Sequence, residues 1–305
     1  MKKKEKIRLI LGSALLSMLI EVSTFPKPLN VDRFMGLKNV KFENFLATTS
    51  YVSISYLDAI LDGLKNRQNI GKRIYEATSA MLKFQSGKNT SLGTIMLLIP
   101  LITATAKSLQ YKDEVTVEDV KENVKSILNS TTYIDSIWIC KAILENRPSW
   151  LIKVDKYDIL KEDWEDEIKK DNANVKMLMR NSQNFDWIAY EYCNDYSLTF
   201  NENYPFFKKA LENYNNLNSS ALKTFIWMLS RRIDSHIYRK FGYNIAETVR
   251  KNAEHYYKRI EKGEDVITVA AEFKETYLQS NINAGTTADL LAAVLFLSFV
   301  TFLKI

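Results

Sequence analysis

Four short segments of this chain combine glycine, lysine, carboxylate and hydroxyl side chains in patterns that suit phosphate chemistry. The chain has 305 residues but only nine glycines, so a glycine in a polar setting is informative. The first such segment, Gly87-Lys88-Asn89-Thr90-Ser91-Leu92-Gly93, lies between two apolar stretches. A polar loop that leads into a helix presents free N–H groups and the positive end of the helix dipole, which bind anions. We therefore expect Gly87, Lys88, Asn89 and Thr90 to contact phosphate.

This loop is not a P-loop, because the glycine spacing and the Lys-Ser/Thr ending of that motif are absent. An ordinary helix–helix turn capped by Asn89 or Thr90 explains the same residues, and this alternative remains open.

The segment Asn283-Ala284-Gly285-Thr286-Thr287-Ala288-Asp289 has the same form before the last apolar stretch. In the functional interpretation, Gly285, Thr286 and Thr287 bind phosphate or ribose, and Asp289 binds Mg²⁺ or moves a proton. In the structural alternative, Thr286 and Asp289 form a capping box, because a carboxylate follows the hydroxyl after three residues.

The other two segments contain rigidly placed or clustered cations. Pro26 and Pro28 hold Lys27 in an extended stretch between Glu21 and Asp32, although an ordinary helix break explains it equally well. Further along, Arg232, His236 and Arg239 or Lys240 would share one face of a helix and could neutralise a polyphosphate. A solvent-exposed basic face is the alternative there, with His236 as a packed or hydrogen-bonding residue.

The elements that must position these segments are predicted to be helical. A many-stranded sandwich or barrel needs many tight turns, and nine glycines and five prolines are too few turn-forming residues for them. Apolar residues at helical spacing predict a single all-α domain, residues 1–305, of about ten helices in a bundle-like arrangement. Besides an N-terminal helix, the expected helices are 42–64, 70–85, 94–110 (interrupted or kinked at Pro100), 116–128, 131–146, 205–213, 219–241, 245–260, 265–280 and 287–303.

The two apolar ends of the chain resemble membrane segments but are short for that role. The N-terminal run, 9–20, could belong to a secretory signal, yet it has no small-residue cleavage site before Pro26. We expect a core helix there, and a buried central helix over 290–303. No membrane association is predicted.

Charge and cysteine content limit the possible partners. Five of the first eight residues are basic and only one is acidic, so most of the net charge of +6 lies at this tip. A nucleic-acid-binding face is therefore not indicated. Two cysteines and two histidines predict neither a disulfide framework nor a zinc site. Any metal should be Mg²⁺ held by carboxylates and phosphates, and the expected location is the cytoplasm.

Taken in order, the segments resemble the ATP:dephospho-coenzyme A triphosphoribosyltransferase family. The resemblance is carried by Glu21-Val22 with Pro26-Lys27-Pro28-Leu29-Asn30-Val31-Asp32, by Gly87–Gly93, by Asp234-Ser-His-Ile-Tyr-Arg-Lys-Phe-Gly242 and by Asn283-Ala-Gly-Thr-Thr-Ala-Asp-Leu290. It spans nearly the whole chain, but 145–220 contributes almost nothing.

Several positions depart from the family pattern. Leu29 replaces a usual glycine, Ala284 a usual proline, and Ser91-Leu92 a usual His-Lys pair. A His-x-Asp-Met element, expected soon after the first motif, is missing. The chain therefore resembles a divergent branch of the family. For such a branch the resemblance implies the fold and an ATP-type ligand, but it leaves the identity of the acceptor open.

The resemblance implies transfer of the 5-triphosphoribosyl group of ATP to the 2′-hydroxyl of 3′-dephospho-CoA, with release of adenine. It implies that Lys27, Lys88, Arg239 and Lys240 bind the triphosphate. Asp32, Asp234 and Asp289 would hold Mg²⁺, one of them as general base, and Glu21 would protonate the purine or orient another group. Two other activities remain open: ribosyl or phosphoribosyl transfer in another cofactor pathway, and nucleotide binding without catalysis. A homodimer is also possible.

Overall fold

A computed structural model describes residues 1–37, 40–85, 89–146 and 151–303, and it is all-helical over them, with isolated bridges but no strand. The all-α prediction is confirmed. The number of about ten helices is wrong, because the described residues form fifteen α-helices and one π-helical turn. The excess arises where 155–203 folds into three short helices and the π-helical turn, and where the expected helix 219–241 is divided. These short elements carry too few residues for a periodic pattern to be recognised.

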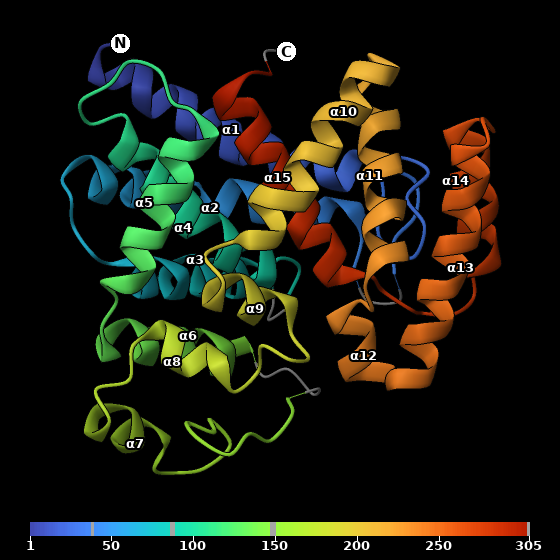
Figure 1. Cartoon of the computed structure of the whole chain (residues 1–305). Coiled ribbons are helices and arrows are strands. Elements are labelled where there is room, and N and C mark those ends of the chain that lie inside the picture. The colour runs from blue at the N-terminus through green and yellow to red at the C-terminus, as the bar shows by residue number, and fades with distance from the viewer. Residues whose placement is uncertain (38–39, 86–88, 147–150, 304–305) are drawn as a thin grey trace.

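Two apolar helices form the centre of the molecule. Nearly every residue is buried in α4 (Leu92–Ser108) and in α15 (Gly285–Thr301). They pack against each other and against α1 (Lys3–Ser23), while α2 (Phe42–Leu64) covers α1 and α4. In Figure 1, α15 runs through the middle of the molecule with α1 on one side and α11 on the other. The central position predicted for the C-terminal apolar helix is confirmed.

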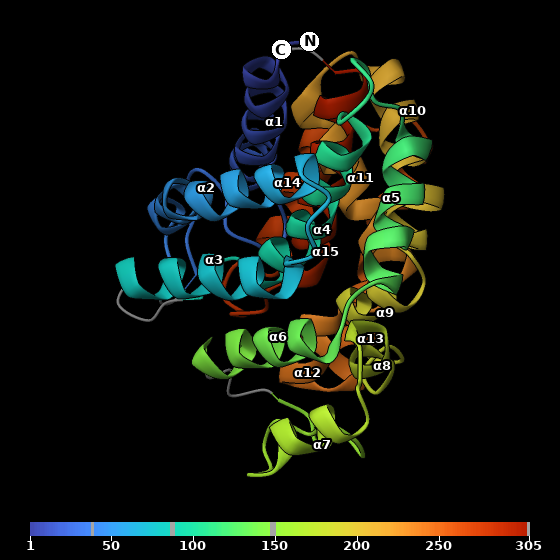
Figure 2. The ribbon, with the colours of Figure 1, turned by 90° about the vertical axis from the view of Figure 1, so that its left-hand side faces the viewer.

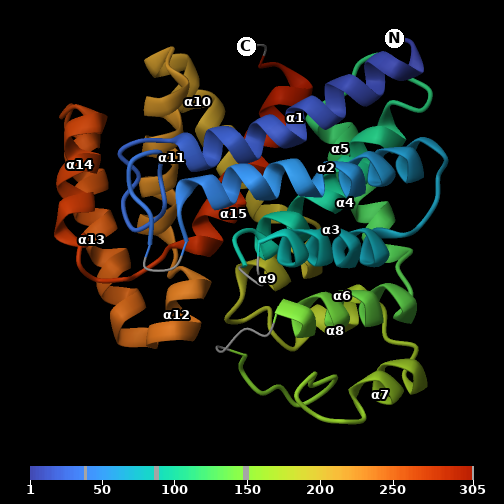
Figure 3. The same ribbon diagram turned by 180° about the vertical axis from the view of Figure 1, so that it is seen from behind.

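The other helices form two groups around this centre. One comprises α3 (Ile70–Phe84), α5 (Val117–Asn129), α6 (Tyr133–Asn146), α7 (Trp164–Lys170), α8 (Val175–Arg180) and α9 (Trp187–Cys193). The second comprises the π-helical turn η1 (Thr199–Asn203), α10 (Tyr204–Tyr214), α11 (Leu217–Arg231), α12 (Ser235–Phe241), α13 (Tyr243–Glu261) and α14 (Val266–Thr276). Figure 2 shows α6 alongside α3, and Figure 3 shows α1, α2 and α3 next to one another on the back of the molecule.

The N-terminal apolar run is a helix of the core: Ile10, Ala14, Met18 and Val22 of α1 are buried. No helix in the described ranges is long and apolar enough to span a membrane. A capping box begins α5: the Thr116 hydroxyl accepts the Asp119 N–H at 3.2 Å, and the Asp119 carboxylate accepts the Thr116 N–H at 3.1 Å.

Helix α4 continues through Pro100 instead of breaking there. Proline has no N–H, so the carbonyl of Met96, four residues earlier, loses its helical partner. The Tyr192 hydroxyl of α9 donates to this carbonyl at 2.6 Å. A buried carbonyl that would cost free energy if unpaired is thereby satisfied from a neighbouring helix.

Replacing Tyr192 by phenylalanine leaves this carbonyl with only the long contact to the Tyr196 hydroxyl at 3.5 Å, so it should lower the free energy of unfolding by roughly 1–3 kcal/mol, the cost of a poorly satisfied buried carbonyl. Urea denaturation followed by circular dichroism measures this change. Tyr111→Phe is the matched control, since Tyr111 is 88% exposed. Equal midpoints for the two variants would show that Tyr192 does not support the helix at Pro100.

The segment 219–241 forms two helices instead of the single helix expected. α11 ends at Arg231, and Asp234 starts α12 by accepting the N–H groups of His236 and Ile237 at 2.9 and 3.0 Å. The predicted basic face that joins Arg232 to His236 and Arg239 is therefore wrong. Asp234 begins α12 as its N-cap residue, and because an N-cap residue has non-helical dihedral angles, one helix cannot continue through this position.

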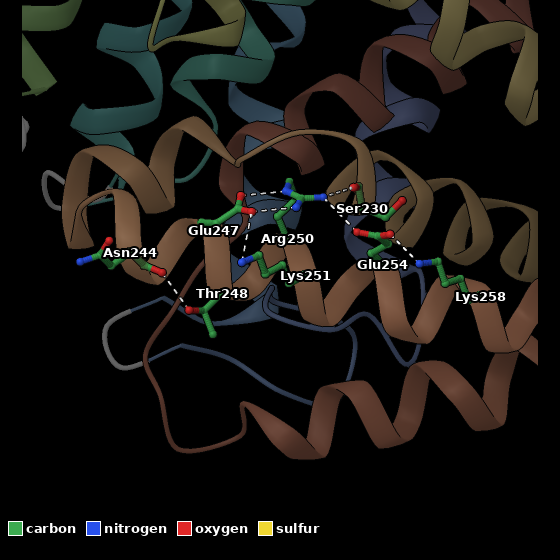
Figure 4. Close-up of polar contacts among 8 residues, drawn as sticks. All are labelled: Ser230, Asn244, Glu247, Thr248, Arg250, Lys251, Glu254 and Lys258. Atoms are coloured by element: carbon green, nitrogen blue, oxygen red, sulfur yellow. Dashed lines mark hydrogen bonds and ion pairs between the residues drawn. The ribbon is translucent and has the colours of Figure 1, made fainter.

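Charged side chains on α13 help to fix this break (Figure 4). Arg250 pairs with Glu247 at 2.7 Å and with Glu254 at 3.2 Å. Its guanidinium also donates to the Ser230 carbonyl at 3.2 Å, one residue before α11 ends. Exposed ion pairs contribute little stability by themselves. The contact with Ser230 matters more for the site, because it ties α13 to the point where the chain turns into α12.

Candidate active site

A cavity of about 220 Å³ lies where the N-terminal ends of α4 and α15 meet, and α12 forms part of its wall. Near these helix ends its lining includes Glu21, Asn30, Asn89, Thr90, Ser91, Gly93, Thr94, Asp186, His236, Arg239, Asn283, Gly285, Thr286 and Asp289. The first N–H groups of a helix have no partner within the helix and carry the positive end of its dipole. Two such ends at one cavity favour an anion there, although the Leu92 N–H of α4 and the Thr287 N–H of α15 already donate to protein side chains.

Of the predicted phosphate loop, Gly87 and Lys88 lie outside the described residues. Asn89 and Thr90 line the cavity. The Asn89 side chain also accepts the Leu92 N–H at 3.1 Å, so it caps the start of α4. The capping and cavity-lining interpretations of Asn89 are therefore compatible.

The Asp289 carboxylate is buried at the cavity and accepts a hydrogen bond from the Thr94 hydroxyl at 2.5 Å. Burial, with smaller contributions from the negative charges of Glu21 and Asp234, raises the pKa of Asp289 to about 8. The expected capping box is not formed, because the N-cap residue of α15 is Ala284, and the Thr287 N–H in the first turn donates to Asp234 instead. Asp289 is therefore available at the cavity wall. A carboxyl that titrates near neutral pH can accept or donate a proton during a reaction.

Gly93 allows the Asp289 carboxylate to approach the backbone of α4. A Cβ atom at Gly93 would lie 2.6 Å from the Asp289 Cγ and 2.7 Å from the Ile188 Cδ1. Both distances are too short for non-bonded atoms. The second glycine of the predicted loop thus makes room for a carboxylate of the same site, a role that local sequence did not suggest.

Glu21 and Lys27 form a buried ion pair next to this carboxylate. The Lys27 ammonium contacts the Glu21 carboxylate and donates to the Glu21 carbonyl at 2.9 Å. Burial raises the pKa of Glu21 and lowers the pKa of Lys27, while their contact favours the charged forms. Lys27 has no exposed surface, so it does not reach the cavity, whereas Glu21 lines it. The structure therefore places Lys27 behind Glu21, where it orients that side chain.

The proline segment is joined to the segment before α15. Asn30 donates to the Asn283 side chain at 2.9 Å, and the Ala284 N–H donates to the Leu29 carbonyl at 2.8 Å. Leu29 itself has a φ of 55°, in the left-handed region that favours glycine. This conformation explains why a glycine suits the position that Leu29 occupies here. The Leu29 side chain is buried in the core, and burial offsets part of the backbone strain.

Asp32 and Asp234 connect elements of the protein and do not line the cavity. Asp32 accepts the N–H groups of Phe34 and Met35, both at 3.0 Å, and contacts the Lys274 ammonium. The second oxygen of Asp234 accepts the Thr287 N–H and hydroxyl, both at 2.8 Å, which links α12 to α15. Thr287 is thus directed to Asp234, whereas Thr286 and Gly285 face the cavity.

The predicted cations on α12 have different positions. Arg239 lines the cavity and pairs with Asp186, which also caps α9 by accepting the Ile188 N–H at 2.9 Å. Lys240 is exposed and does not line the cavity; its ammonium lies over the Phe241 ring. His236 lines the cavity, and burial together with nearby Arg239 lowers its pKa to about 4. It is therefore neutral at physiological pH.

The sequence of the chain matches a known protein family. The family model for ATP:dephospho-CoA triphosphoribosyl transferase matches residues 8–303. The chain belongs to this family. The predicted resemblance is confirmed, and the match includes the weakly similar region 145–220.

A solved structure shows the same fold. The crystal structure of a protein from Archaeoglobus fulgidus, named as a candidate triphosphoribosyl-dephospho-CoA synthase, aligns with a TM-score of 0.64 at 22% identity. The alignment covers 85% of this chain and 100% of that one. No curated protein matches the sequence.

Several cavity residues of this triphosphoribosyl transferase were not singled out from the sequence. Asn30, Thr94 and Asp186 line the cavity and hold its loops and charged groups. Asn30 lies within the first motif and Thr94 directly follows the Gly87–Gly93 motif, so both could have been predicted as site residues from their positions in the sequence. Asp186 lies in the region that contributes almost nothing to the resemblance, and its pairing with Arg239 could be identified only from the fold.

Proposed function

We propose that this transferase carries out its reaction in the cavity between α4, α15 and α12. The family reaction moves the 5-triphosphoribosyl group of ATP to the 2′-hydroxyl of 3′-dephospho-CoA and releases adenine. The observation that supports this site best is Asp289: its buried carboxyl has a pKa of about 8 and lies between two helix N-termini that favour anions. The sequence predictions of a homodimer and a cytoplasmic location remain predictions.

In this proposal the triphosphate is bound, not cleaved. The N-terminal ends of α4 and α15, with Asn89, Thr90 and Thr286, contact its oxygens, and Arg239 supplies positive charge. Placement of the triphosphate fixes the ribose carbon C1′ near Asp289 and Glu21. Binding energy from the unreactive phosphates is thus used to orient the reacting carbon.

The chemical step exchanges one bond at C1′ for another. The 2′-hydroxyl oxygen of the acceptor forms a bond to C1′ while the bond from C1′ to the adenine nitrogen breaks. The bonding electrons leave with adenine, which takes up a proton from solvent to become neutral, and the hydroxyl proton passes to the ionised Asp289 carboxylate. Glu21, held by Lys27, provides negative charge that stabilises the positive charge developing at C1′.

The described residues contain no group of three or more His, Cys, Asp or Glu side chains that could hold a metal ion. Asp32 and Asp234 use both carboxylate oxygens for contacts within the protein. Glu21 and Asp289 are the predicted acidic site residues that line the cavity. Mg²⁺ commonly uses one or two carboxylates together with substrate phosphates. We propose that Mg²⁺ enters as part of the ATP substrate, next to Asp289, and that Asp32 and Asp234 position structural elements.

Chromatography for free adenine tests the function. The protein incubated with ATP, Mg²⁺ and dephospho-CoA should release one adenine for each triphosphoribosyl-dephospho-CoA formed, with no phosphate released. Tight ATP binding without adenine release would contradict the proposal and favour a binding protein. Adenine release with other hydroxyl acceptors but not with dephospho-CoA would favour a transferase of another cofactor pathway.

A further inference from the structure

One side of the cavity is apolar and comes from the part of the chain between α6 and α9. Its side chains include Ile143 of α6, Leu178 of α8, and Ile152, Val154 and Leu160 from the segment 151–160. We call these five residues the aliphatic wall. They lie in the region 145–220 or directly before it, where the sequence carries none of the four motifs.

Two residues of the aliphatic wall are unusually exposed for large apolar side chains. Ile152 is 39% exposed and Leu160 is 49% exposed. Because both line the cavity, their exposed surface is available to a molecule inside it. Ligand sites typically combine an apolar lining with a few polar groups, and this arrangement matches that pattern.

The segment that carries the wall is held in place by its own contacts. The Tyr157 N–H donates to Glu167 at 2.8 Å, and the Tyr157 hydroxyl donates to Asp171 at 3.0 Å. The Asn181 side chain donates to the Lys156 carbonyl at 3.1 Å. Tyr157 is also buried in a separate apolar cluster with residues of α6 and α7. These contacts hold the segment between the wall residues Val154 and Leu160 before a ligand binds, which lowers the entropy cost of binding.

The chemistry of the wall favours a flexible aliphatic chain over a planar base. Proteins often bind bases through aromatic stacking, and the lining has Phe45, Phe185 and the buried Tyr157 but is mainly aliphatic between α6 and α9. Asn181 and Ser182 line the same side and can form hydrogen bonds with amide groups. An arm of methylene groups interrupted by amides would match both kinds of residue.

On the basis of the proposed function, we propose that the aliphatic wall binds the pantetheine arm of the acceptor dephospho-CoA. The adenosine 2′-hydroxyl of the acceptor then reaches Asp289 at the polar end, and its arm extends toward α6 and α8. The wall thereby selects an acceptor with this arm over a plain nucleotide.

Comparison of two acceptors tests this assignment. ADP carries the same adenosine 2′-hydroxyl and a diphosphate but has no arm. With ATP saturating, Ile152→Asn and Leu160→Asn should each lower kcat/KM for dephospho-CoA about tenfold, as expected for loss of apolar contact. The value for ADP should change less than twofold, and so should KM for ATP. The matched control is Ile134→Asn on α6, because Ile134 is 52% exposed and does not line the cavity.

Three other outcomes would decide against the assignment. Equal losses with both acceptors would show that the wall supports the site without contacting the arm. A raised KM for ATP with unchanged use of dephospho-CoA would place the adenine of ATP at the wall. Equal affinity of the wild-type protein for dephospho-CoA and ADP, measured by calorimetry, would show that the arm is not recognised. Absence of adenine release together with wall-dependent binding of dephospho-CoA would contradict the proposed function but not this inference.

Discussion

Replacement of Asp289 by asparagine should reduce adenine release by at least about a thousandfold, within the range typical for loss of a general base. The substitution keeps the shape of the side chain and an oxygen that can accept the Thr94 hydrogen bond. ATP binding, measured by calorimetry, should persist because the helix N-termini remain. Activity within tenfold of the wild type would show that another group takes the proton.

The pH dependence gives an independent measure of the same group. Because kcat/KM reports ionisation in the free enzyme, it should rise with pH up to about 8, where Asp289 loses its proton, and then level off. The residual activity of the asparagine variant should lack this rise. A rise centred near 4 in the wild type would indicate a different base, such as His236.

The same variant should be more stable than the wild type at neutral pH. In the folded protein the pKa of Asp289 is about 8, so the carboxyl is mostly protonated below that pH, whereas in the unfolded chain it ionises near its ordinary pKa of 3.8. The carboxyl therefore lowers stability progressively as pH rises from about 4 to 8. Asparagine lacks this penalty, so its gain in Tm should be small at pH 4 and largest at pH 8. Scanning calorimetry at these two pH values measures the difference, and no gain at pH 8 would contradict the raised pKa.

Alanine at Gly93 is expected to have the second-largest effect. Its Cβ would overlap both the Asp289 carboxylate and the Ile188 side chain, so the carboxylate must move. A displacement of about 1 Å can cost a hundredfold in rate, and we expect at least this loss of kcat. Overpacking should also lower the free energy of unfolding by about 1–3 kcal/mol.

Gly12→Ala on α1 is the matched control for this substitution. Gly12 lies in a helix, and a Cβ there would meet no atom within 4 Å. Alanine should therefore raise the free energy of unfolding by up to about 1 kcal/mol and leave activity unchanged. Wild-type activity of Gly93→Ala would show that Asp289 does not need its present position.

The long helices could be predicted from the sequence because each has a clear periodic or continuous apolar pattern. The expected ranges 42–64 and 70–85 match α2 and α3 within one residue, and 287–303 matches α15 within two at each end. The short helices α7, α8 and α9 could not be predicted, because six or seven residues contain too little periodicity. The break before α12 was missed because the apolar pattern continues across Asp234, which acts as a cap only through its side-chain geometry.

The motifs identified the segments that form the site but not the role of each residue within them. All three predicted Mg²⁺ aspartates have the same side-chain chemistry, so sequence could not distinguish them. Packing does: Asp32 and Asp234 are saturated by N–H, hydroxyl and ammonium donors of the protein, whereas Asp289 lines the cavity. Lys27 and Lys240 were expected at the triphosphate, but one is buried behind Glu21 and the other is exposed away from the cavity.

The sequence by itself determined the helical fold, the family and the loops that surround the site, because these depend on local patterns and on motifs that retain their order. Only the tertiary structure decided which carboxylate is at the cavity, that Gly93 makes room for it, and that the region 145–220 supplies an apolar wall. Those properties depend on contacts between residues far apart in the chain, such as Thr94 with Asp289 and Arg239 with Asp186. A pKa shift or a cavity lining results from burial by several elements at once, and no local segment contains that information.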